Sequence, residues 1–331
     1  MNKKRIDQPE SKLVQKWKAI RSVKEFSIVV ILLAMIIFAS LVSPAFLSVT
    51  NLRTTAVGFA CNGIIAIAMT LALVSGGFDL SVGAVLGLST ITVVYLANHG
   101  ISIWVACMAG IVVGIICGAI SGFLIGYVKL NAFITTLGMQ QMARGLVYVL
   151  TNGGSVGLGD VPGENAFRFV GSGSIGNFPF LVIVFILFTI LGDIIVRKSC
   201  VARNVFFVGS NEKTALLSGI NIRFVKMMVY VMTGALSGLA GVLTASRFGT
   251  ATSSTGSGVE MTVISAAVIG GVSLSGGKGT VAGAVLGVVM MSIISNILVI
   301  MNVSVHWQDF ITGMILIIAI IFDVLSNRRK N

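Results

Sequence analysis

The chain has 331 residues, of which 56% are hydrophobic, 39 are glycine and only 10% are charged. Soluble proteins contain roughly 25% charged residues, so this composition, with a mean hydropathy of +1.00, excludes a soluble globular fold. The net charge of +12 does not indicate nucleic-acid binding. Basic residues interspersed with apolar stretches fit membrane topology better than a continuous phosphate-binding stripe.

Ten apolar stretches follow one another along the chain, and we predict a membrane-spanning helix from each. The first begins at Phe26, after a polar segment that is too long for an ordinary signal peptide, so we expect it to stay uncleaved. The stretches cover residues 26–43, 55–74, 80–98, 101–128, 132–150, 179–196, 227–245, 261–275, 279–300 and 309–325. The predicted fold is an all-α integral membrane protein with about ten transmembrane helices.

The distribution of basic residues predicts how these helices are oriented. If the chain starts in the cytoplasm, nineteen of its 23 Lys and Arg residues fall in cytoplasmic segments, whereas Arg53, Arg168 and Arg247 face outward. This excess follows the positive-inside rule and predicts that both termini are cytoplasmic. We expect a cytoplasmic segment at 1–25, a transmembrane domain at 26–325 that includes a cytoplasmic loop at 197–226, and a cytoplasmic tail at 326–331.

Glycine patterns predict where helices pack closely. Glycine recurs at every fourth position in two spans, which removes side chains from one stripe and lets a neighbouring backbone approach. The stripes consist of Gly110, Gly114, Gly118, Gly122 and Gly126 and of Gly279, Gly283 and Gly287. The segments Ser75–Gly87 and Ser275–Gly287 also agree at eight of thirteen positions. Because glycine-interrupted spans in corresponding halves are typical of transporters, we expect an internal structural repeat.

Polar side chains inside the predicted spans are candidates for a translocation path. A charge in hydrocarbon is unfavourable, so it usually faces a bundle interior or a wet cavity. Asp79 interrupts a glycine-rich break between the second and third spans. Thr136, Gln140 and Arg144 are four residues apart and therefore share one helical face. For this face, lining a path and bonding to another helix are equally compatible with the sequence.

No motif in the sequence indicates catalysis, metal binding or nucleotide hydrolysis. The glycine cluster around Lys278 lacks the upstream Gly and the following Ser or Thr that a phosphate-binding loop requires. Nothing pairs His99 or His306 with a nucleophile or carboxylate, and the four cysteines lack metal-ligand spacing. We expect no enzymatic activity, no metal and no cofactor.

The predicted cytoplasmic loop 197–226 contains a short helical pattern. Asn211 follows a turn and is placed to cap a helix with its side chain. A surface helix beside the bilayer would be suited to receive force from a partner protein. A plain basic loop explains the same pattern equally well, because the loop carries six basic residues.

Three stretches resemble the sugar-type permeases of bacterial ATP-binding-cassette importers, the ribose, arabinose and xylose group within the branched-chain-type permease superfamily. They are SGGFDLSVG at Ser75–Gly83, KLNAFITTLGMQQMARGL at Lys129–Leu146 and VGSNEKTALLSGINIRFVKMMVY at Val208–Tyr230. A fourth, VIGGVSLSGGKGTVAGAVLG at Val268–Gly287, fits the glycine-rich segment of this group. The order and spacing of the stretches make the resemblance specific, and it covers most of the chain beyond the first span.

The resemblance implies a monosaccharide importer subunit in the bacterial plasma membrane that has no ATPase of its own. It implies a second permease copy or a paralogue beside it, ATP-binding cassette subunits inside and an extracytoplasmic sugar-binding protein outside. The third stretch resembles the coupling region of the family, which makes coupling candidates of Gly209, Asn211, Glu212, Ala215, Gly219 and Ile220. Lys213, Thr214 and Leu216 depart from the family pattern there.

The implied mechanism is alternating access, with solute selection delegated to the binding protein. Arg53 and Arg247 are expected to dock that protein, because outward cations can pair with acidic patches. The chain shows no dense cluster of planar polar and aromatic side chains, so we expect a mainly steric path. Asn62 and Asn296 face either this path or another helix.

Other functions remain compatible with the sequence. A furanose-like signalling molecule could replace the sugar in an importer of the same class. A secondary transporter driven by an ion gradient would need a buried carboxylate, for which Asp79 is the best candidate. A channel would also use glycine-rich spans, but it would conduct without ATP or a docking protein.

Overall fold

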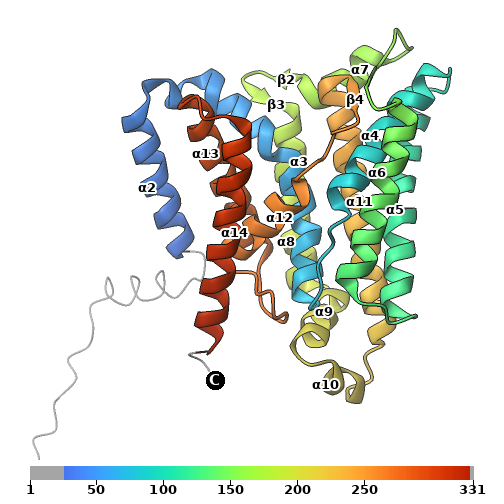
Figure 1. The fold of residues 1–331 in the computed structure, drawn as a ribbon, viewed down its shortest axis with the longest axis vertical. Helices are drawn as coiled ribbons and strands as arrows, with labels where there is room; N and C mark the ends of the chain where they lie inside the picture. The colour runs from blue at the N-terminus through green and yellow to red at the C-terminus, as the bar shows by residue number, and fades with distance from the viewer. Residues whose placement is uncertain (1–25, 329–331) are drawn as a thin grey trace, which may run out of the picture.

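The computed structural model describes residues 26–328, which form an all-helical protein with a few short strands (Figure 1). The helices are α2 (Phe26–Val42), α3 (Val49–Val74), α4 (Val82–Asn98), α5 (Ile103–Gly126), α6 (Ala132–Thr151), α7 (Glu164–Ser172), α8 (Phe180–Lys198), α9 (Cys200–Ser210), α10 (Glu212–Leu217), α11 (Ile222–Phe248), α12 (Val259–Ile269), α13 (Val281–Ile300) and α14 (Val305–Arg328). The predicted cytoplasmic segment 1–25 and residues 329–331 of the predicted tail lie outside the described residues.

A helix stands at each of the ten predicted stretches. Five of them, α3, α5, α8, α11 and α13, are long and apolar enough to cross a membrane. The prediction for 261–275 is corrected: α12 has 11 residues and rises about 16 Å, roughly half the thickness of the hydrocarbon core. The chain enters α12 from β4 through a loop of consecutive turns at residues 253–258 that leads into the bundle (Figure 1). The apolar run at 261–275 therefore corresponds to a short buried helix that is too short to cross the membrane by itself.

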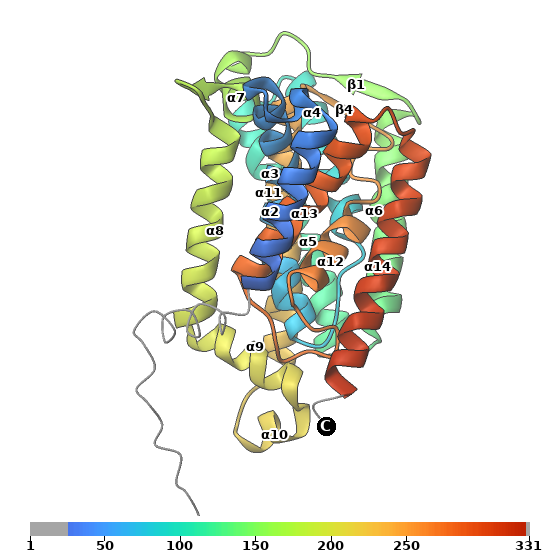
Figure 2. The ribbon, with the colours of Figure 1, turned by 90° about the vertical axis from the view of Figure 1, so that its left-hand side faces the viewer.

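The two ends of the bundle carry different elements (Figures 1 and 2). Helices α9 and α10 lie at one end, which we call the α10 end, and α14 finishes toward it. The other, the α7 end, carries α7 and two antiparallel strand pairs, β1 (Ser155–Gly157) with β4 (Thr250–Thr252) and β2 (Ser174–Ile175) with β3 (Phe178–Pro179). Basic residues gather at the α10 end, on α8 to α11 and the α5–α6 turn: Lys129, Arg197, Lys198, Arg203, Lys213, Arg223 and Lys226.

The first glycine stripe lets α5 and α11 pack backbone to backbone, as predicted. A Cβ atom added to Gly114 would overlap the carbonyl oxygen of Gly234, and one added to Gly118 would overlap that of Tyr230. A Cβ atom on Gly234 would in turn overlap the carbonyl oxygen of Gly114. The second stripe packs on α12, where Gly287 lies against the carbonyl oxygen of Ala266. The absence of side chains is therefore a requirement of both helix pairs.

The two segments of the sequence repeat lie against each other at the α10 end. Gly76 and Gly276 both adopt left-handed backbone conformations, with φ angles of 85° and 83°. A Cβ atom on Gly276 would lie 3.1 Å from the Cα atom of Gly76. The helices that follow begin at Val82 and Val281, whereas the preceding helices finish at Val74 and Ile269. The two segments share a turn glycine and a helix start, and they differ in where the preceding helix ends.

Candidate functional site

Asp79 lies in the segment between α3 and α4, buried at 1% relative exposure. Its Oδ1 accepts hydrogen bonds from the backbone N–H of Ser81 at 2.9 Å and from the Ser81 hydroxyl at 2.6 Å. Its Oδ2 accepts from the Thr233 hydroxyl of α11 at 2.5 Å. Both carboxylate oxygens are therefore engaged, and the side chain ties the start of α4 to α11.

Replacing Asp79 tests this role. Asp79→Leu would leave the backbone N–H and the hydroxyl of Ser81 without an acceptor, so we expect the free energy of unfolding to fall by about 3 kcal/mol. The Thr233 hydroxyl would keep the Tyr230 carbonyl as its acceptor. Asp79→Asn keeps an acceptor for Ser81, and its amide can donate to the Thr233 hydroxyl, so stability should stay within about 1 kcal/mol. Thermal unfolding of both purified variants in detergent measures the difference. Equal unfolding midpoints for the two variants would contradict the assignment.

The predicted polar face of α6 bonds to elements near the start of α12. Arg144 NH1 donates to the carbonyl oxygens of Thr255 at 2.6 Å and Ser253 at 3.2 Å. Gln140 Nε2 donates to Glu260 Oε1 at 3.1 Å. Thr136 donates back to the carbonyl oxygen of Ala132, within its own helix. Arg144 thus holds the turns before α12 in place, and Gln140 bonds to the first turn of α12 itself.

Glu260 is a polar residue of this region that sequence reasoning missed. It lies in the first turn of α12 at 7% relative exposure, and its Oε2 forms no hydrogen bond within the described residues. A Cβ atom on Gly83 would overlap this oxygen, so the carboxylate sits against the first turn of α4. Helix N-termini favour negative charge. A lone acidic residue directly before an apolar stretch was the available signal in the sequence.

A cavity of about 350 Å³ lies between α3, α11 and the segment that follows β4. Arg247 and Asn62 both line it. Arg247 is partly buried, donates to the carbonyl oxygen of Val57 at 3.2 Å and lies 4.7 Å from the ring centroid of Phe248. Asn296, in contrast, exchanges hydrogen bonds of 2.8 and 3.0 Å with Asn51. The two asparagines that the sequence left undecided therefore have different environments.

The coupling candidates occupy α9, α10 and the turn after them. Asn211 caps α10 by accepting from the backbone N–H of Thr214 at 3.0 Å, which confirms the predicted cap. Glu212 pairs with Lys226 of α11 at 2.5 Å. Ala215 is buried, and Gly219 takes a φ of 78° in the turn that follows α10. The backbone N–H of Ile220, which is partly buried, donates to the Ala215 carbonyl at 3.1 Å and closes this turn.

Gly209 connects this region to the interior of the bundle. A Cβ atom there would overlap the carbonyl oxygen of Val74 and lie 2.9 Å from the backbone nitrogen of Gly277. Gly277 N–H itself donates to the Val74 carbonyl at 2.8 Å. The end of α9 therefore contacts both the end of α3 and the turn before α13.

The outward surface of α10 is apolar. Leu217 is 89% exposed and Leu216 is 63% exposed, although both lie on a six-residue helix among charged neighbours. Exposed leucines that stand side by side on a polar surface are typical of protein contacts.

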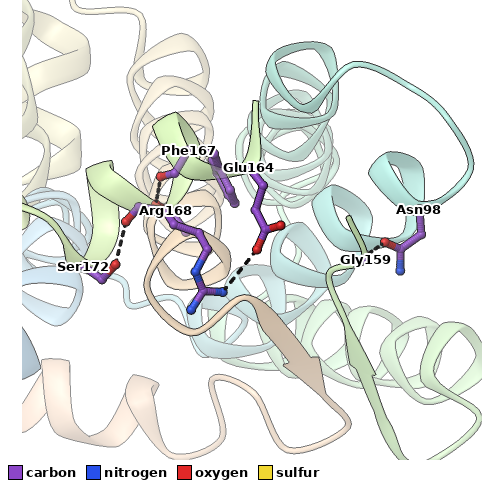
Figure 3. Close-up of polar contacts among 7 residues, drawn as sticks. Asn98, Gly159, Glu164, Phe167, Arg168 and Ser172 are labelled. Carbon is purple, nitrogen blue, oxygen red and sulfur yellow. Dashed lines mark hydrogen bonds and ion pairs between the residues drawn. The ribbon is translucent and has the colours of Figure 1, made fainter. Parts of the chain in front are cut away.

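Polar contacts at the α7 end lie both within α7 and between neighbouring elements (Figure 3). Arg168 of α7 is directed at Glu164, 4.0 Å away, and the Ser172 hydroxyl donates to the Arg168 carbonyl at 2.7 Å. Asn98, at the end of α4, accepts from the backbone N–H of Gly159 at 2.9 Å. Arg53 is exposed in the first turns of α3 and donates to the Ser174 hydroxyl.

Known proteins resemble this chain along most of its length. It is 32% identical to the L-arabinose transport system permease protein AraH of Escherichia coli strain K12 over 306 residues, 92% of each chain. It is 37% identical to the ribose import permease protein RbsC of Bacillus subtilis strain 168 over 293 residues, 88% of this chain and 90% of that one. No solved structure gives a significant match.

A family model described as the permease component of branched-chain amino acid transport systems matches residues 51–320. The matched range runs from α3 into α14, so it includes the α6 polar face, the cavity and the α9–α10 region. The chain belongs to this family of transport permeases.

Proposed function

We propose that this chain is the membrane-spanning subunit of an ATP-binding-cassette importer that carries a monosaccharide across the bacterial plasma membrane. The observation that carries the proposal is its similarity, over about nine-tenths of the chain, to permeases named for L-arabinose and ribose. The sequence has no phosphate-binding loop, so separate ATP-binding subunits supply the energy. A sugar-binding protein delivers the solute from outside, and a second permease copy or a paralogue completes the path.

In this proposal the α10 end faces the cytoplasm. The clustering of basic residues there supports the orientation under the positive-inside rule. The chain crosses the membrane ten times, with α12 and its entering segment together forming one passage, and both termini are cytoplasmic. Residues 26–325 form the transmembrane domain between the two cytoplasmic ends, 1–25 and 326–331.

Coupling runs from α10 into the bundle through packed backbone. ATP-driven closure of the cytoplasmic partners displaces α10, and α9 moves with it because Asn211 alone separates the two helices. Gly209 transmits the displacement to Val74 and Gly277, which border the segments leading to α4 and α13. A contiguous set of packed elements with two arrangements is what coupling between distant sites requires. Asp79, Thr136, Gln140 and Arg144 then belong to the segments whose rearrangement opens the path.

The docking of the binding protein is assigned to Arg53. Arg53→Glu should slow docking and reduce stimulation of ATP hydrolysis by the binding protein about fivefold, because charges at the edge of an interface mainly change association rates. Arg53→Lys, which keeps the charge, should resemble the wild type. ATP hydrolysis by the reconstituted importer, titrated with binding protein at low salt, measures the effect. Unchanged stimulation of Arg53→Glu would remove the assignment, whereas Arg247 lines the cavity.

The solute class is tested with the complete importer in liposomes. We expect ATP-dependent uptake of at least one sugar from a panel of D-ribose, L-arabinose and D-xylose. ATP-dependent uptake of a furanose-like signalling molecule with none of these sugars would place the chain in the same transporter class with a different solute. Uptake of the sugars driven by an ion gradient without ATP would contradict the proposal. The engagement of both Asp79 oxygens in structural hydrogen bonds argues against that alternative.

A further inference from the structure

The cavity near the α7 end brings together polar side chains that are scattered in the sequence. Its volume of about 350 Å³ falls in the range of small-molecule sites, roughly 300–1,000 Å³. Three elements supply its polar lining, which consists of Asn62 from α3, Thr244 and Arg247 from α11, and Thr250, Thr252 and Thr255 from β4 and the segment after it. Among the described residues that line it, none is acidic.

Several of these groups have hydrogen-bonding capacity to spare. The Asn62 amide forms no hydrogen bond within the described residues, so its two donors and its acceptor are available. Arg247 uses NH1 for the Val57 carbonyl, and a guanidinium has five N–H donors in all. The Thr252 and Thr255 hydroxyls, in contrast, bond to each other at 3.0 Å, and the Thr255 oxygen also accepts from the backbone N–H of Thr252 at 2.9 Å. The cavity thus presents both donors and acceptors.

The remaining wall of the cavity is apolar. Phe248 is 55% exposed and lines it with Leu86 and Val259. A monosaccharide has hydroxyl groups along its edges and C–H groups on its faces, so it needs both kinds of wall. Pockets for such ligands combine apolar surface with a few placed polar groups. A neutral polyhydroxylated molecule can use this lining, because Arg247 and Asn62 offer donors to its hydroxyl oxygens and the described lining residues include no carboxylate that would favour a cation.

We propose that this cavity is a subsite at which the permease itself holds the hydroxyl groups of its solute during passage. The inference rests on the proposed function and gives it a location: solute released by the binding protein at the α7 end first meets Asn62, Arg247 and the threonines after β4. It also revises the expectation of a mainly steric path. Binding at this subsite is weak, because a transport site must release what it binds.

Gly58 offers a way to fill the cavity without disturbing the fold. It lies on α3 among the lining residues, and a Cβ atom added there would have nothing within 4 Å. Larger side chains at this position occupy the cavity progressively, so we test Gly58→Ala, Gly58→Leu and Gly58→Phe. The matched control is Gly145→Phe on α6, another helical glycine whose added Cβ atom would have nothing within 4 Å and which does not line the cavity.

The experiment measures ATP-dependent uptake of D-ribose, L-arabinose and D-xylose by the complete importer in liposomes, together with ATP hydrolysis stimulated by the binding protein. We expect uptake to fall with side-chain size, by about tenfold or more for Gly58→Phe. A second variant, Asn62→Leu, keeps the size of the side chain and removes the amide groups available to the solute, and it should reduce uptake about fivefold. Stimulated hydrolysis should stay within about twofold for all variants, because docking and coupling lie elsewhere.

The two readouts separate the subsite from the function on which it rests. Graded loss of uptake with retained hydrolysis supports the subsite. Uptake at the control level in Gly58→Phe and Asn62→Leu, while the wild type transports, overturns the subsite and leaves the importer intact. Absence of uptake and of stimulated hydrolysis in the wild type overturns the proposed function, and the subsite with it.

Discussion

Leu217→Asp is expected to uncouple the importer. Leu217 stands 89% exposed at the end of α10, on the surface that we assign to the ATP-binding partner. An unpaired carboxylate buried in an interface costs about 2 kcal/mol or more, so the substitution should reduce uptake and stimulated ATP hydrolysis about thirtyfold. Both activities would fall together, because the contact that transmits the motion is lost.

The control for this prediction is Leu217→Met, which preserves an apolar side chain of similar volume and should keep at least about half of the activity. Copurification of the ATP-binding subunit with each variant reports the contact directly. Leu217→Asp should release that subunit while the permease remains in the membrane. Full uptake and an intact complex in Leu217→Asp would show that α10 is not the coupling contact.

Gly118→Leu should strongly destabilise the bundle. A Cβ atom on Gly118 would overlap the carbonyl oxygen of Tyr230 and lie 3.1 Å from the Cα atom of Gly234. Backbone atoms cannot rotate away as a side chain can, so α5 and α11 would have to separate along their length. We expect the free energy of unfolding to fall by about 3 kcal/mol or more, at the upper end for an overpacked site.

Gly138→Leu on α6 is the matched control, because a Cβ atom there would have nothing within 4 Å. Its unfolding midpoint in detergent should stay near that of the wild type, whereas Gly118→Leu should unfold at a clearly lower temperature. Equal midpoints for the two variants would mean that α5 and α11 tolerate separation. The close contact would then not be a requirement of the fold.

Local patterns in the sequence predicted much of this architecture. Apolar stretches locate the long helices because a chain in hydrocarbon must pair its own backbone polar groups, which a helix does. Each such helix therefore appears in the sequence as a long run of apolar residues. The glycine stripe from Gly110 to Gly126 predicted that another helix packs closely on α5, because the four-residue spacing can be read within one helix without knowing its neighbour. Asn211 was recognisable as a cap because the backbone N–H of Thr214 that it binds lies three residues away.

Features that depend on tertiary contacts could not be predicted in this way. The helix α12 starts only after the turns that follow β4, and Arg144 holds those turns through carbonyl groups more than a hundred residues away. Asn62 and Arg247 meet across one cavity although they come from distant helices. Glu260 gains its surroundings from α4 and α6 together. Such neighbours are brought together by the packing of the helices, so no regular spacing in the sequence reveals them.

The central claim is that this chain moves solute only when ATP-consuming partners drive it and a binding protein supplies it. The most direct test compares liposomes that contain the purified chain alone with liposomes that contain it together with its ATP-binding subunits. Both preparations contain ATP inside the liposomes and receive binding protein and a sugar panel outside. Liposomes with the complete assembly should accumulate sugar, and liposomes with the lone chain should accumulate none. Rapid sugar accumulation by the lone chain, with or without an ion gradient, would contradict the account.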